Sequence, residues 1–117
     1  MYNVIMQSKP ELNLQTASIM THLRRGLEAL YGSRLKKLIL YGSQARGDAV
    51  SGSDIDVLVV LDGPVNPYDE ITRTGEITAA LSLQYDVVIS CVYVSAERYQ
   101  KEQSPLLLNI HREGVLV

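Results

Sequence analysis

Two pairs of residues within 41–60, YGSQARGDAVSGSDIDVLVV, have types and spacing suited to phosphate chemistry. Gly42 and Ser43 stand where an apolar segment ends and a short helix can begin, and a helix start offers backbone N–H groups to an anion. After ten further residues come Asp54 and Asp56. On a strand their carboxylates point to one face, about 6.5–7 Å apart along the chain. Two like charges there repel unless a cation relieves them, and such oxygen ligands suit Mg²⁺ or Mn²⁺.

Each part of this pattern also has an ordinary interpretation. Gly42 and Ser43 alone fit a common strand-to-helix turn, and Asp54 and Asp56 alone fit a solvated strand edge. Asp86 opens a later apolar run, YDVVIS, and there it either marks the start of a strand or completes a three-carboxylate site for two metal ions. The combination favours phosphate chemistry, because average residue usage gives the joint spacing by chance in about one chain in a thousand.

The elements that must position these residues are predicted from apolar periodicity. Helices are expected at 11–30, 67–83, 95–103 and 104–114, with a turn or short helix after residue 43, and strands at 34–42, 54–64 and 85–94. The loop between the first two strands is too short for a crossover helix, which favours antiparallel neighbours. The alternation predicts an α/β (α+β) fold, in which a small mixed sheet packs on helices.

Length and composition exclude several classes of protein. The 117 residues fit a single domain, 1–117, and the formal net charge of −2 gives no basic face for a direct nucleic-acid partner. No apolar run approaches the roughly 20 residues that cross a membrane, and no signal-peptide pattern opens the chain. We therefore expect no membrane association and a cytoplasmic location. Cys91 is expected to be a buried strand residue, and His22 and His111 are expected to face solvent.

The motif GSQARGDAVSGSDIDVLVV, residues 42–60, resembles that of the minimal nucleotidyltransferases of the DNA-polymerase-β-like superfamily. Their signature is Gly-Ser followed, ten residues later, by Asp-X-Asp. The ending SPLLLNIHREGVLV, residues 104–117, is also similar to the tail of these small proteins, so the resemblance spans roughly 15–117. Residues 1–11 lie outside it and are expected to form a peripheral extension. The resemblance implies a polymerase-β-like nucleotidyltransferase core.

For the nucleotide, the resemblance implies ATP as the substrate, with release of pyrophosphate. Gly42 and Ser43 would hold the β- and γ-phosphates, and Arg46 would lie near the phosphate tail. Ser53 is expected to cap or orient the entry to the second strand beside the nucleotide.

For the metal, the resemblance implies two Mg²⁺ ions, with Mn²⁺ as an alternative. Asp54 and Asp56 would bind both ions. Asp86, as the family's third carboxylate, would bind the ion that activates the attacking hydroxyl and could accept its proton.

The resemblance further implies an antitoxin, because minimal nucleotidyltransferases are often encoded beside a HEPN-domain ribonuclease toxin. The expected reaction transfers AMP to a hydroxyl, of a tyrosine, on that partner and so neutralises it. Two alternatives stay open. One is an antitoxin that neutralises its HEPN partner by complex formation without catalysis, and the other is a nucleotidyltransferase with another acceptor.

Overall fold

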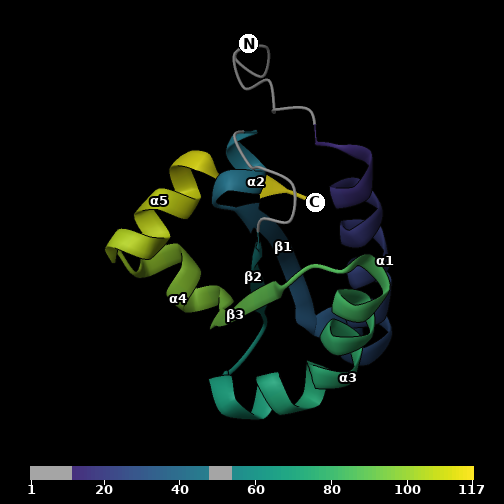
Figure 1. The fold of residues 1–117 in the computed structure, drawn as a ribbon. Helices are drawn as coiled ribbons and strands as arrows, with labels where there is room; N and C mark the ends of the chain where they lie inside the picture. Colours follow the sequence, from purple (N-terminus) through teal and green to yellow (C-terminus); the bar gives the residue numbers. More distant parts are fainter. Residues whose placement is uncertain (1–11, 48–53) are drawn as a thin grey trace.

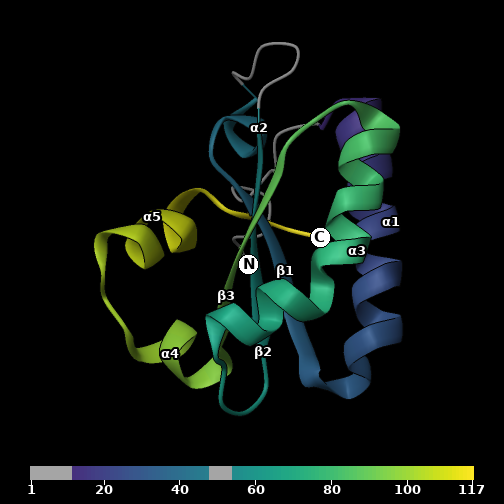
Figure 2. The same ribbon diagram turned by 60° about the horizontal axis from the view of Figure 1, so that its bottom comes forward.

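A four-stranded mixed sheet with helices on both faces forms the fold (Figures 1 and 2). The computed structural model describes residues 12–47 and 54–117. The helices are α1 (Leu14–Tyr31), the 3₁₀ turn η2 (Gly32–Arg34), α2 (Ser43–Arg46), α3 (Pro67–Tyr85), α4 (Ala96–Lys101) and α5 (Pro105–Glu113). The strands are β1 (Leu35–Tyr41), β2 (Ile55–Leu61), β3 (Ile89–Ser95) and β4 (Val115–Leu116). The predicted mixed α/β architecture is confirmed.

The strand order is β3-β2-β1-β4, with the strand that follows the Asp-X-Asp pair at the centre. β1 and β2 are antiparallel, as the short loop predicts, and their register sets Tyr41 opposite Asp56. β2 and β3 are parallel, because the chain returns through α3 before it enters β3. β4 pairs antiparallel with β1 and was not predicted from the sequence. Two residues are too few to show a strand period.

Both faces of β2 are buried, which explains its unbroken apolar run. Ile55 and Val57 belong to the larger core, which α1 and α3 cover. Leu58 and Val60 point to the opposite face, where they pack with Leu107 of α5. In Figure 2 the sheet stands between α1 and α3 on one side and α4 and α5 on the other. The alternation along β2 therefore carries residues 54 and 56 to the α4/α5 face.

A buried carboxylate fastens α3 to the end of α1. Glu70 is 3% exposed and accepts hydrogen bonds from Tyr31 Oη at 2.7 Å and Arg73 Nη1 at 2.5 Å. Arg34 Nη1 lies 3.5 Å from its other oxygen. Burial alone would raise the pKa of Glu70, but these hydrogen bonds and the two cations outweigh it and hold the pKa below its usual range. The charged form of Glu70 therefore stabilises this end of the domain.

Side chains of the N-cap residues accept hydrogen bonds at the starts of α1, α3 and α5. Asn13 Oδ1 accepts from Thr16 N at 2.7 Å at the start of α1. Asn66 and Ser104 cap α3 and α5 in the same way, each followed by proline in the first turn. Within the described ranges, no helix is long and apolar enough to cross a membrane.

Candidate active site

The Gly-Ser turn lies directly against the Asp-X-Asp pair. Gly42 adopts φ 77° and ψ −157°, a conformation that is almost restricted to glycine. A β-carbon added to Gly42 would lie 2.7 Å from Asp56 Oδ2, closer than real β-carbons approach. Glycine is therefore required here both for the backbone conformation and for the space that the Asp56 carboxylate occupies. The two halves of the motif therefore lie close together, as the sequence predicts.

Ser43 begins α2, a single helical turn that follows β1. The Gly42 carbonyl accepts from Ala45 N and Arg46 N, both at 3.1 Å, and so closes the turn. Gly47, at φ 80° and ψ 10°, ends the helix in the left-handed conformation. The first N–H groups of any helix have no acceptor one turn earlier, so this turn presents backbone donors at the end of the sheet where Asp56 lies.

The two carboxylates differ in their surroundings. Asp54 is exposed just before β2, whereas Asp56 is half-buried within it. Burial raises the pKa of Asp56, and the negative charge of Asp54 raises it further. The neighbouring Tyr41 has its pKa raised by burial and then by the charge of Asp56. Burial is the larger cause of both shifts, and the neighbouring carboxylate charge adds to it; a bound cation would offset that charge.

Asp86 lies elsewhere than its predicted position at the start of the third strand. It is the exposed C-cap of α3, in the left-handed conformation with φ 55° and ψ 51°, and β3 begins only at Ile89. The register instead places Ser90 beside Asp56. In residues 12–47 and 54–117 no three His, Cys, Asp or Glu side chains are grouped so as to hold a metal ion. The role of Asp86 as the third ligand stays a prediction.

The other predicted nucleotide contacts flank the loop before β2. Arg46 is exposed in the last turn of α2, and its role near the phosphate tail stays a prediction. Ser53 lies outside the described residues. A residue that the sequence analysis missed is Gln44, whose Oε1 accepts from the buried Thr16 hydroxyl at 3.0 Å. No sequence signal connects these two positions, because they are 28 residues apart and meet only in the fold.

The remaining titratable candidates do not form a second catalytic set. Cys91 is half-buried, and burial raises the pKa of its thiol to about 11, so the nucleophilic thiolate is scarce at neutral pH. His22 and His111 are exposed, as predicted. His22 Nδ1 lies 2.9 Å from the Tyr85 hydroxyl, and His111 Nε2 lies 3.0 Å from the Tyr99 carbonyl oxygen.

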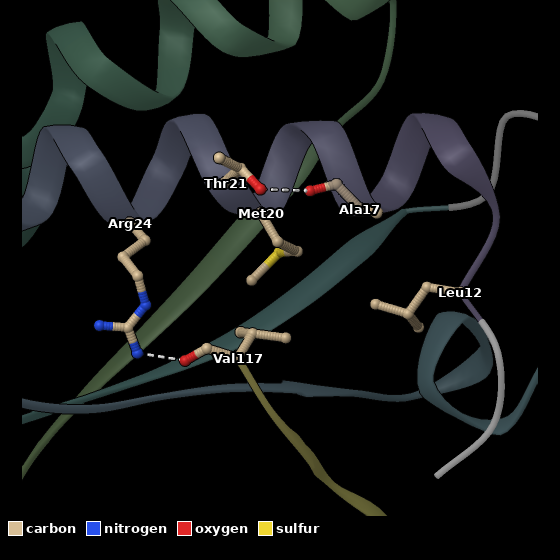
Figure 3. A pocket seen from close by; sticks show the side chains of 6 residues that line it. All are labelled: Leu12, Ala17, Met20, Thr21, Arg24 and Val117. Atoms are coloured by element: carbon tan, nitrogen blue, oxygen red, sulfur yellow. Dashed lines mark hydrogen bonds between the residues drawn. The ribbon is translucent and has the colours of Figure 1, made fainter.

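A cavity of about 230 Å³ lies between α1 and the C-terminal segment, apart from this site (Figure 3). Its lining is largely apolar, with Met20 and Leu12 beside Val117. Arg24 is its charged residue, and this guanidinium donates to the Val117 carbonyl oxygen and to Glu28. None of the predicted site residues lines this cavity.

Comparison with known proteins identifies the family. A family model described as "Nucleotidyltransferase domain" matches residues 20–117, which include the whole Gly-Ser and Asp-X-Asp motif. The chain belongs to the nucleotidyltransferase domain family. As a member of this family it is a transferase, and its motif residues occupy the site described above.

Individual relatives agree with this assignment. The chain is 41% identical over 76 residues to the Methanocaldococcus jannaschii protein "Putative protein adenylyltransferase MJ0604", covering 65% of this chain and 70% of that protein. A chain from a crystal structure of a toxin–antitoxin with AMP-PNP has a TM-score of 0.59 at 19% identity, covering 88% of this chain and 72% of that one. A chain from a structure of a tri-AMPylated Shewanella oneidensis HEPN toxin in complex with an MNT antitoxin gives 0.50 at 19% identity, covering 88% and 68%. The two structural likenesses show a shared fold.

Proposed function

We propose that the chain transfers AMP from ATP to a tyrosine hydroxyl of a partner HEPN toxin, releases pyrophosphate and thereby neutralises the toxin. The observation that carries this proposal is the close approach of Gly42 to the Asp56 carboxylate, which leaves no space for a β-carbon at Gly42. It joins an anion-binding turn to a carboxylate pair, and an enzyme that handles a metal-bound triphosphate needs both. Protein adenylyltransferase is also the activity in the name of the Methanocaldococcus jannaschii relative.

The residues of the site fit a divalent cation. Asp54 and Asp56 offer hard oxygen ligands close together in the chain, and the negative charge of Asp54 adds to burial in raising the pKa of Asp56. In the proposal these two side chains hold Mg²⁺, two ions in the complete complex, with Mn²⁺ as a substitute. When bound, Mg²⁺ neutralises the phosphate oxygens and lowers the pKa of a coordinated hydroxyl.

The chain's own groups position the nucleotide. Gly42 and Ser43 hold the β- and γ-phosphates, which keeps the leaving pyrophosphate in line with the attacking oxygen. Arg46 supplies positive charge near the phosphate tail, and Ser53 orients the entry to β2. Asp86, in the connection between α3 and β3, is the proposed third carboxylate.

In the proposal the acceptor hydroxyl is supplied by another protein. The proposed partner is a HEPN toxin, on the strength of the fold shared with a chain of the Shewanella oneidensis complex, in which such a toxin is AMPylated. We place the reaction in the cytoplasm, where ATP and Mg²⁺ are available.

The test uses the purified chain, the protein encoded by the adjacent gene as the candidate acceptor, Mg²⁺ and ATP labelled either at the α- or at the γ-phosphate. AMP transfer predicts that the partner gains the α-label and no γ-label, and that Asp56→Asn abolishes the gain. Asp62→Asn is the matched control, because Asp62 is an exposed aspartate just beyond the other end of β2. The absence of α-label with the wild-type chain, or equal label with Asp56→Asn, contradicts the proposal. If the Asp54→Ala/Asp56→Ala chain neutralises the toxin without transferring label to it, the alternative antitoxin that acts by complex formation is favoured.

A further inference from the structure

A buried hydroxyl on α1 contacts the Gly-Ser motif from outside it. Thr16 is 3% exposed, and its Oγ1 donates to Gln44 Oε1 at 3.0 Å. Gln44 directly follows Ser43, the residue that begins α2. A buried hydroxyl without a hydrogen-bond partner is costly, and Gln44 Oε1 supplies a partner for Thr16.

α2 depends on such contacts for its orientation. Its four residues form one turn. An isolated helical turn is not stable, because fixing the backbone of the first turn costs more free energy than its hydrogen bond contributes. The side chains of Ala45 and Gln44 are among the groups that connect the turn to the rest of the fold. Ala45 is fully buried in the core under α1, and Gln44 is held by Thr16. Ala45 fixes the depth of the turn, whereas the Gln44 contact opposes rotation about that anchor.

The contact is rigid at its α1 end as well. Asn13 accepts from the Thr16 backbone N–H at 2.7 Å and caps α1, so the Thr16 backbone is fixed where the helix begins. A continuous set of hydrogen bonds therefore runs from the α1 cap through Thr16 to Gln44, the residue after the proposed phosphate contact at Ser43. Every distance in this set is 3.0 Å or less.

We propose that Thr16 is a positioning residue for the nucleotide: through Gln44 it sets the orientation of the turn that carries Ser43, and so it tunes nucleotide affinity without touching the nucleotide. The inference rests on the nucleotide site proposed above. It predicts that Thr16→Val, which keeps the shape and removes the donor, weakens binding of AMP-PNP with Mg²⁺ about five- to tenfold. This factor corresponds to one hydrogen bond of roughly 1–1.4 kcal/mol.

The experiment measures the dissociation constant of AMP-PNP with Mg²⁺ by calorimetry and the melting temperature of the same samples. Thr16→Ser keeps the hydroxyl and should restore affinity to within about twofold of wild type, because the donor returns. Gln44→Ala should weaken binding as Thr16→Val does, and the double variant should be no weaker than either single one, since both remove the same contact. Thr21→Val is the matched control, because Thr21 is an exposed α1 threonine whose hydroxyl bonds to the Ala17 carbonyl within the helix.

Three results would overturn the inference: unchanged affinity in Thr16→Val, failure of Thr16→Ser to recover affinity, or additive losses in the double variant. A fall in melting temperature with unchanged affinity would assign Thr16 to stability alone. Failure of the wild-type chain to bind AMP-PNP with Mg²⁺ would instead refute the proposed function. The two failures are therefore distinguishable in one set of titrations.

Discussion

Replacing Gly42 by alanine should damage stability and nucleotide binding together. Alanine at φ 77° and ψ −157° costs about 1–3 kcal/mol of backbone strain. The added β-carbon would also lie 2.7 Å from Asp56 Oδ2, so the carboxylate or the turn must move. We expect a loss of about 2–4 kcal/mol in the free energy of unfolding. This loss exceeds the backbone strain alone, because moving the carboxylate or the turn also disturbs the packing around them. Affinity for AMP-PNP with Mg²⁺ should fall at least about tenfold, because displacing either group separates the anion-binding turn from the carboxylates.

Gly63→Ala separates the two causes. Gly63 also has a positive φ, 83°, but an added β-carbon there has nothing within 4 Å. Urea unfolding of Gly63→Ala should therefore show the strain cost alone, and its AMP-PNP affinity should match wild type. Equal losses of stability in Gly42→Ala and Gly63→Ala, with wild-type affinity for AMP-PNP in both, would contradict this prediction. The close approach of Gly42 to Asp56 would then have no functional consequence.

Three further variants test the electrostatics. Asp56→Asn should abolish AMP transfer and, without metal, raise the free energy of unfolding at pH 7. Because the pKa of Asp56 is raised in the fold, its negative charge destabilises the folded state as the pH rises above 3.8. Urea titrations at acid pH should therefore show that this gain in stability disappears. Glu70→Gln should lower stability by about 2–3 kcal/mol at pH 7 with AMP-PNP affinity retained, since the charged hydrogen bonds to Tyr31 and Arg73 are lost. Because the pKa of Glu70 is lowered, the wild-type contribution is present above 4.5 and is lost as pH falls, so a stability difference that persists undiminished in acid contradicts this assignment. Cys91→Ser should leave transfer rates unchanged, and rapid alkylation of Cys91 at pH 7 would contradict its raised pKa.

Much of the fold follows from local patterns in the sequence. The apolar runs locate β1 and β2 because both are buried over several residues, and the short loop between them requires an antiparallel pair. The predicted start of β3 at residue 85 is wrong, because Tyr85, Val87 and Val88 are typical strand residues although β3 begins only at Ile89. In the structure α3 continues to Tyr85, and Asp86 closes it in the left-handed conformation that aspartate tolerates.

The site is predictable where the chemistry is local and unpredictable where it depends on packing. The Gly-Ser turn and the Asp-X-Asp pair were expected to come together from the combined motif, and Gly42 does lie close to the Asp56 carboxylate. Ser90 beside Asp56 follows only from the parallel register of β2 and β3, which no residue type signals. The Thr16 contact to Gln44 depends on how α1 lies over the sheet, so it also required the fold.

The proposed function requires that the Gly-Ser turn and the Asp-X-Asp pair act as one metal-dependent nucleotide site. Calorimetric titration of AMP-PNP, with and without Mg²⁺, into the wild-type chain and Asp56→Asn measures this directly. We predict that the wild-type chain binds AMP-PNP only in the presence of Mg²⁺ and that Asp56→Asn does not bind it under either condition. Equal binding with and without Mg²⁺, or binding by Asp56→Asn that matches the wild-type chain, would contradict the account.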